Sequence, residues 1–93
     1  MPLIKFGCYK EDKDKPVYPW KLGNDTMDVQ ECARRAVEVG FRNFAMAYAE
    51  WGGWCMGGLD LQKAMENGRH DGECDPVGKD FISTIYQVKS NET

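Results

Sequence analysis

Four cysteines, widely spaced along 93 residues, constrain this chain more than any other feature of its sequence. They are Cys8, Cys32, Cys55 and Cys74. None belongs to a Cys-x-x-Cys pair, so the spacing is not that of a zinc site or a thioredoxin-type redox motif. Separated cysteines in even number are typical of a disulfide framework in a short secreted chain, and the alternative is a set of buried free thiols in a cytosolic protein. Spacing alone leaves all three pairings open.

The length predicts a single domain, 1–93, with its core over about 3–88 and a frayed tail at 89–93. The net charge is −3, and acidic and basic residues are interspersed along the whole chain. Because there is no basic stripe and no long apolar stretch, we expect neither nucleic-acid binding nor insertion into a membrane. Two Asn-x-Thr triplets, at Asn24 and Asn91, agree with passage through a secretory pathway.

The clearest local pattern is a helix that starts after Asp28. Asp28 and Glu31 have the spacing of a capping box, and Gly40 stands where a left-handed residue would end the helix. The residues expected to face the core follow helical spacing: Val29, Cys32, Ala33, Ala36 and Val37, with Val39 as a further candidate. Those expected to face water are Gln30, Arg34, Arg35 and Glu38.

Strands are expected at 3–9, 41–49, 54–56 and 81–88, and a short second helix at 59–67. In the first strand, alternation places Ile4, Phe6 and Cys8 together on the apolar face. This order of elements predicts an α+β domain, with one main α-helix packed on an antiparallel β-sheet and a short second helix.

Four segments resemble the characteristic parts of WSC domains, a family of small disulfide-linked modules. They are Gly7-Cys8-Tyr9, Thr26–Cys32, Gly40–Phe44 with Gly53–Cys55, and Cys74 with Ile85–Val88. In that order they are similar to the family's opening Gly-Cys-Tyr, its cysteine-bearing helix, the strand pair after the helix, and its closing segment. The resemblance covers about residues 6–88 and extends more distantly to PAN/apple domains. WSC domains usually carry more cysteines than the four found here.

The resemblance implies a disulfide pairing and a function. In the layout of the family, Cys32 would form a disulfide with Cys55 that links the helix to the sheet, and Cys8 would form one with Cys74. WSC domains are regarded as glycan-binding modules, so the resemblance implies a secreted, lectin-like protein whose partners are glycans or glycoproteins.

A glycan site needs an exposed aromatic ring for the apolar C–H face of a sugar, and polar groups for its hydroxyls. The candidate ligand-binding residues are Tyr18, Trp20, Glu50, Trp51, His70 and Asp71. The first two belong to a loop stiffened by prolines, the next two to a glycine-rich turn, and the last two to an irregular polar segment. The alternative interpretation is that the tryptophan side chains simply fill a small core.

Other functions have less support in the sequence. Carboxylates alternate with Gly72 over Asp71–Asp75, but the segment lacks the twelve-residue calcium-loop pattern, so a solvated loop is favoured and no cofactor is expected. An enzyme is not expected, because a nucleophilic cysteine would leave an odd number for bridges and a domain this small rarely builds a deep cleft.

A weak single site would gain avidity from a homodimer or higher oligomer. The main alternative is a protein-interaction or extracellular-matrix module without sugar binding.

Overall fold

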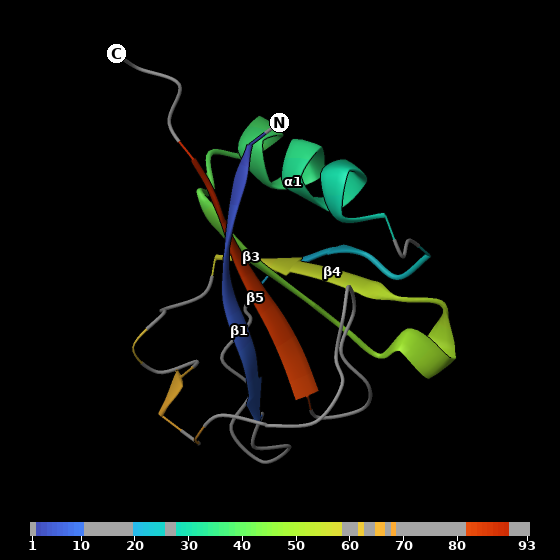
Figure 1. Cartoon of the computed structure of the whole chain (residues 1–93). Coiled ribbons are helices and arrows are strands. Elements are labelled where there is room, and N and C mark those ends of the chain that lie inside the picture. Colours follow the sequence, from blue (N-terminus) through green and yellow to red (C-terminus); the bar gives the residue numbers. More distant parts are fainter. Residues whose placement is uncertain are drawn as a thin grey trace.

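In the part of the chain that the structure describes, a ten-residue α-helix packs on one side of a five-stranded antiparallel sheet (Figure 1). The computed structural model describes residues 2–10, 20–25, 28–58, 62, 65, 66, 68 and 82–89, without the side chain of Trp51. The strands are β1 (Leu3–Lys10), β2 (Trp20–Gly23), β3 (Asn43–Ala47), β4 (Trp54–Gly57) and β5 (Ile82–Val88). The helix is α1 (Val29–Glu38), and a 3-10 turn, η1 (Ala49–Trp51), joins β3 to β4. The predicted α+β class is confirmed.

The strand order is β1-β5-β3-β4-β2, and every neighbouring pair is antiparallel. The first and last described strands, β1 and β5, are therefore neighbours, and β2 forms the opposite edge. The short strand β2 is not among the strands that the sequence predicts. The second helix expected at 59–67 lies mostly outside the described residues.

Helix α1 begins and ends as predicted. The carboxylate of Asp28 accepts hydrogen bonds from the backbone N–H groups of Gln30, at 2.9 Å, and Glu31, at 3.3 Å. These bonds satisfy two of the donors that a helix start leaves free. At the other end, Gly40 has φ of +90°, the left-handed conformation that glycine adopts without steric cost.

The buried side of α1 is narrower than the sequence pattern predicts. It consists of Cys32, Ala33 and Ala36, all fully buried. Val37 and Val39 are 46% and 54% exposed, so the prediction that they face the core is wrong. Val37 lies at the margin of the buried stripe, and Val39 is the C-cap residue, where the helical direction no longer applies.

A disulfide between Cys32 and Cys55 joins α1 to β4, with the two Cα atoms 5.5 Å apart. This pairing is confirmed. Around it lies the core cluster between helix and sheet, which includes Phe44 and Tyr86 with ring centroids 5.3 Å apart. Cys8 is also disulfide-bonded, whereas its expected partner, Cys74, lies outside the described residues.

The face of the sheet away from α1 is also buried, around Ala45, Met56 and Ile85. A bulge between Lys5 and Gly7 breaks the alternation of β1. As a result Phe6 and Tyr9, three positions apart, pack against the same cluster. Ile4 is 39% exposed, so the prediction of one apolar face shared by Ile4, Phe6 and Cys8 is wrong.

Replacing both Cys32 and Cys55 by alanine should lower the free energy of unfolding by about 3 kcal/mol, because the bridge closes a loop with a sequence separation of 23 residues. Urea denaturation of the oxidised proteins measures the loss. Val39→Ala, an exposed substitution, should change stability by less than about 0.5 kcal/mol. A double variant as stable as the parent would contradict a structural role for this bridge.

Candidate functional site

Of the large hydrophobic side chains that the structure describes, Trp20 is the most exposed, at 58%. It is the first residue of the edge strand β2 and pairs with Gly57 at the end of β4. Its ring lies against that of Phe41, with the centroids 6.1 Å apart and the planes inclined by 52°. The pair presents an aromatic surface at one edge of the sheet. The prediction that Trp20 is available to a ligand is therefore compatible with its place in the fold, and the alternative that it fills the core is not.

A shallow depression of about 270 Å³ adjoins this pair. The described residues that line it come from the connection between α1 and β3 and from the position after β4: Gly40, Phe41, Arg42, Asn43 and Gly58. Phe41 belongs to both the depression and the aromatic pair. The volume is close to the lower limit of ordinary ligand pockets, so the depression suits one small ring better than an extended ligand.

Two of the described residues that line the depression have polar side chains. Arg42 is exposed and carries a guanidinium group with several donors. The side-chain oxygen of Asn43 accepts a hydrogen bond of 3.0 Å from Nε2 of Gln87. This bond uses the oxygen of the Asn43 amide, so the hydrogen bonds that the amide can still donate come from its NH₂ group. The depression thus combines an aromatic ring, a cation and an amide.

Gly57 allows the aromatic pair to lie close to β4. A Cβ atom at this position would lie 2.7 Å from Cδ2 of Phe41 and 2.9 Å from Cδ1 of Leu22. Both distances are too short for carbon atoms, so any larger residue would displace the Phe41 ring or the Leu22 side chain. The absence of a side chain at Gly57 therefore positions one wall of the depression.

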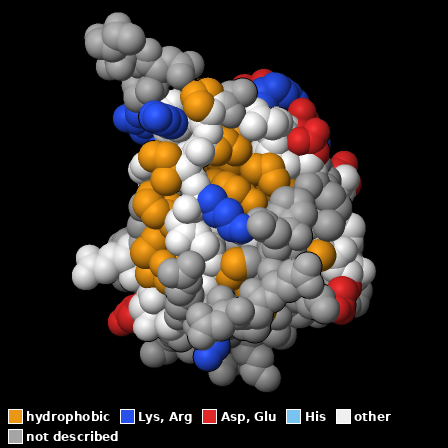
Figure 2. Space-filling model, viewed as in Figure 1, with side chains coloured by type: hydrophobic (Ala, Val, Ile, Leu, Met, Phe, Trp, Pro, Cys, Tyr) orange, Lys and Arg blue, Asp and Glu red, His pale blue; other side chains and the backbone are white. Residues whose placement is uncertain are grey.

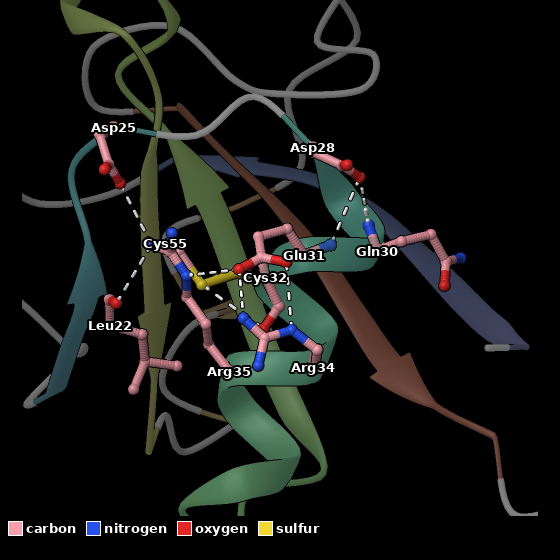
Figure 3. The surroundings of a disulfide bond; sticks show 9 residues. All are labelled: Leu22, Asp25, Asp28, Gln30, Glu31, Cys32, Arg34, Arg35 and Cys55. Carbon is pink, nitrogen blue, oxygen red and sulfur yellow. Dashed lines mark hydrogen bonds and ion pairs between the residues drawn. A yellow bond between two sulfur atoms is a disulfide. The ribbon is translucent and has the colours of Figure 1, made fainter.

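Arg35 ties β2 to the helix. Its guanidinium donates to the Leu22 carbonyl at 3.4 Å and to the Asp25 carboxylate at 3.2 Å, while its Nε donates to Glu31 at 3.2 Å. Figure 3 shows these contacts beside the Cys32–Cys55 disulfide. With only 26% of its side chain exposed, Arg35 does not simply face water, and that prediction is wrong. The helix side chain instead reaches the strand that carries Trp20.

Gly23 makes room for this contact, because a Cβ atom there would overlap the Arg35 guanidinium. Arg34, one position earlier, forms ion pairs with Glu31 and Glu38 along the helix surface. The hydrogen bond from Arg34, reinforced by Arg35, holds the pKa of Glu31 below its ordinary value. Both arginines of α1 are therefore engaged by carboxylates, and their role is structural.

Glu50 and Trp51 lie at the other end of β4. They belong to η1, which follows Tyr48 in the left-handed conformation, with φ of 58°, and precedes Trp54. Glu50 is exposed. Because Trp20 pairs with Gly57 and η1 leads into Trp54, the structure does not bring these predicted residues into one site.

Trp54 is packed rather than free. Its ring centroid lies 4.8 Å from that of Tyr48, and Nζ of Lys21 lies 3.9 Å from the centroid. This arrangement is a cation–π contact on a partly buried ring, and it occupies the surface next to η1. The remaining predicted ligand-binding residues, Tyr18, His70 and Asp71, lie outside the described residues.

Sequence reasoning missed Phe41, Arg42 and Asn43 as candidate site residues, because the segment reads as the start of a strand rich in aromatics. The available signal is the polar pair Arg42-Asn43, placed between two phenylalanines directly after the glycine that ends the helix. In a fully buried strand such a pair would be costly, so it marks the point where the chain meets the surface.

In the described part of the chain, no three histidine, cysteine, aspartate or glutamate side chains gather in a way that would hold a metal ion. No helix found there has the length and apolar character needed to cross a membrane. The carboxylates at Asp71–Asp75 lie outside it.

Comparison of the chain with protein-family models, with curated proteins and with solved structures finds no match in any of the three. The resemblance to WSC domains therefore stays a prediction from the sequence segments that carry it.

Gly57→Ala should lower the free energy of unfolding by about 1–3 kcal/mol, because the added methyl group overlaps Phe41 and Leu22. Thermal or urea denaturation measures this loss. A double-mutant cycle with Phe41→Ala, which removes the ring, should show a coupling of at least about 0.5 kcal/mol. Additive effects of the two substitutions would mean that the ring does not rest over Gly57.

Acid should remove the contribution of Glu31 to stability. Its folded-state pKa lies below the unfolded value near 4.5, so its ion pairs stabilise the protein fully above that pH and are lost as pH falls through the lowered pKa. We expect Glu31→Gln to have a slightly lower Tm than the parent near neutral pH, and the two Tm values to converge on acidification. A Tm difference that is constant from about pH 7 to about pH 3 would contradict this assignment.

Proposed function

We propose that this protein is a non-catalytic carbohydrate-binding module whose site is the depression beside Trp20 and Phe41. The observation that carries the proposal is the exposed Trp20 ring next to a depression lined by Phe41, Arg42 and Asn43. An exposed tryptophan at a strand edge adds little to folding, because most of its apolar surface stays in water. Its exposure therefore favours a role in binding.

The chemistry of this surface suits a sugar ring. The C–H face of a pyranose packs on an aromatic side chain, while its hydroxyl groups exchange hydrogen bonds with guanidinium and amide groups. Arg42 and Asn43 supply those donors within the same depression as the Phe41 ring. A shallow site of this size should bind one sugar weakly, with a Kd in the millimolar range, corresponding to about −4 kcal/mol.

An extracellular location belongs to the same proposal. The Cys32–Cys55 bridge and the absence of free thiols among the described cysteines agree with an oxidising compartment. The segments that resemble WSC domains support glycan binding independently of the surface. Weak sites of this kind become effective when several copies act together, so association with other copies would strengthen binding without new contacts.

A glycan array probed with the oxidised protein, displayed as a multimer, tests the proposal. The parent should bind a restricted set of glycans, and Trp20→Ala should weaken that binding by at least about tenfold, or about 1.4 kcal/mol. Trp51→Ala, at the other end of β4, and Val39→Ala, an exposed aliphatic on the helix side, should retain it. Circular dichroism confirms that each variant is folded.

Two outcomes would contradict this assignment. Loss of binding in Trp51→Ala with retention in Trp20→Ala would move the site to the η1 turn. A folded multimer that binds no glycan would exclude carbohydrate recognition and leave the aromatic pair as the centre of a protein-interaction surface.

A further inference from the structure

We propose that the depression selects acidic saccharides, in which a carboxylate or a sulfate ester on the sugar pairs with Arg42. This inference rests on the proposed carbohydrate-binding function and names the chemical class of its ligand. It depends on the charge around Arg42, which differs from that around the other arginines of the described chain.

The arginines of α1 already have carboxylate partners. Arg34 pairs with Glu31 and Glu38, and Arg35 pairs with Glu31 and Asp25. Arg42, by contrast, forms no ion pair with any carboxylate of the described residues, although it lines the depression. No carboxylate of the described residues therefore competes with an acidic ligand for its guanidinium.

The end of β5 lies close to Arg42. The backbone N–H of Val88 donates to the carbonyl of Arg42 at 2.8 Å, so the end of β5 lies against the site and Lys89 follows directly. Figure 2 shows Lys and Arg side chains near the end of β5, and none of the acidic side chains that the structure describes lies beside them on this face. The described charged side chains on this part of the surface are thus basic, although the whole chain carries a net charge of −3.

The neighbours of Arg42 fit an acidic sugar better than a simple anion. A guanidinium holds a carboxylate or sulfate through two parallel hydrogen bonds, which is the geometry that arginine favours. Phe41 offers an aromatic ring in the same depression, and the Asn43 amide offers a further donor. The ring of the sugar and its charged group would thus each have a matching partner.

Binding of matched glycan pairs tests the inference. The pairs are a uronic-acid oligosaccharide with its neutral counterpart, and a sulfated oligosaccharide with its desulfated form. We expect the parent to bind at least one acidic member about tenfold or more tightly than its neutral partner at low salt, and the preference to shrink as salt rises. The two pairs distinguish a carboxylate from a sulfate ester.

Arg42→Gln should abolish the preference. The acidic member loses its ion pair and should weaken to the level of the neutral one, whereas the neutral member loses only hydrogen bonds to its hydroxyl groups and should weaken less. Arg34→Gln is the matched control, because it removes an equal charge from a paired arginine on the helix surface and should leave the preference intact. Inorganic sulfate and acetate, added as competitors, should displace the acidic glycan only weakly, since they lack the ring that packs on Phe41.

Equal binding of acidic and neutral members by the parent would overturn the inference and leave the carbohydrate-binding proposal standing. An equal loss for both members in Arg42→Gln would also overturn it, because Arg42 would then serve only the hydroxyl groups. If the folded protein binds no member of either pair and no glycan on the array, the proposed function fails together with the inference.

Discussion

The disulfide between Cys32 and Cys55 is the constraint on which the rest of this small structure depends, because it fixes α1 to β4, the strand beside the edge strand β2. The helix contributes little apolar volume of its own, since its fully buried residues are Cys32, Ala33 and Ala36. Small side chains let the helix approach closely, and larger ones from the sheet, such as Phe44 and Tyr86, fill the space. A domain this small buries only a modest apolar core, so a covalent link at its centre compensates for what packing cannot supply.

The position of the candidate site follows from that link. Strand β2 has only four residues, and β4 is its pairing partner in the sheet. Its second attachment is Arg35, which extends from the helix to Leu22 and Asp25. The disulfide fixes the position of the helix, and the helix carries Arg35. The contacts of Arg35 with Leu22 and Asp25 in turn help to hold the strand that begins with Trp20. Strain or loss at the bridge would therefore reach the aromatic surface without any change in the residues that form it.

Local chemistry made part of this structure predictable. Asp28 and Gly40 act within one turn of the helix ends, so the local sequence is enough to identify them as the helix boundaries. The Cys32–Cys55 pairing was predicted from the family resemblance instead, because the spacing of four cysteines leaves three pairings open. The bulge in β1 and the edge strand β2 escaped prediction because both depend on partners distant in sequence. For the same reason Arg42 and Asn43 look like ordinary strand residues until the end of β5 is placed against them.

The exposure of Trp20 makes sense only when the edge of the sheet is considered with it. An open edge with a large apolar side chain invites pairing with other chains, and folded proteins limit that risk with short strands and charged residues. Here β2 is short, Lys21 follows Trp20, and the Lys21 ammonium is held over Trp54. These features discourage another chain from pairing with the backbone of β2. The Trp20–Phe41 pair instead adjoins the depression that Arg42 and Asn43 line. A surface arranged in this way favours a small cyclic ligand with polar or charged substituents over an extended strand from a partner chain.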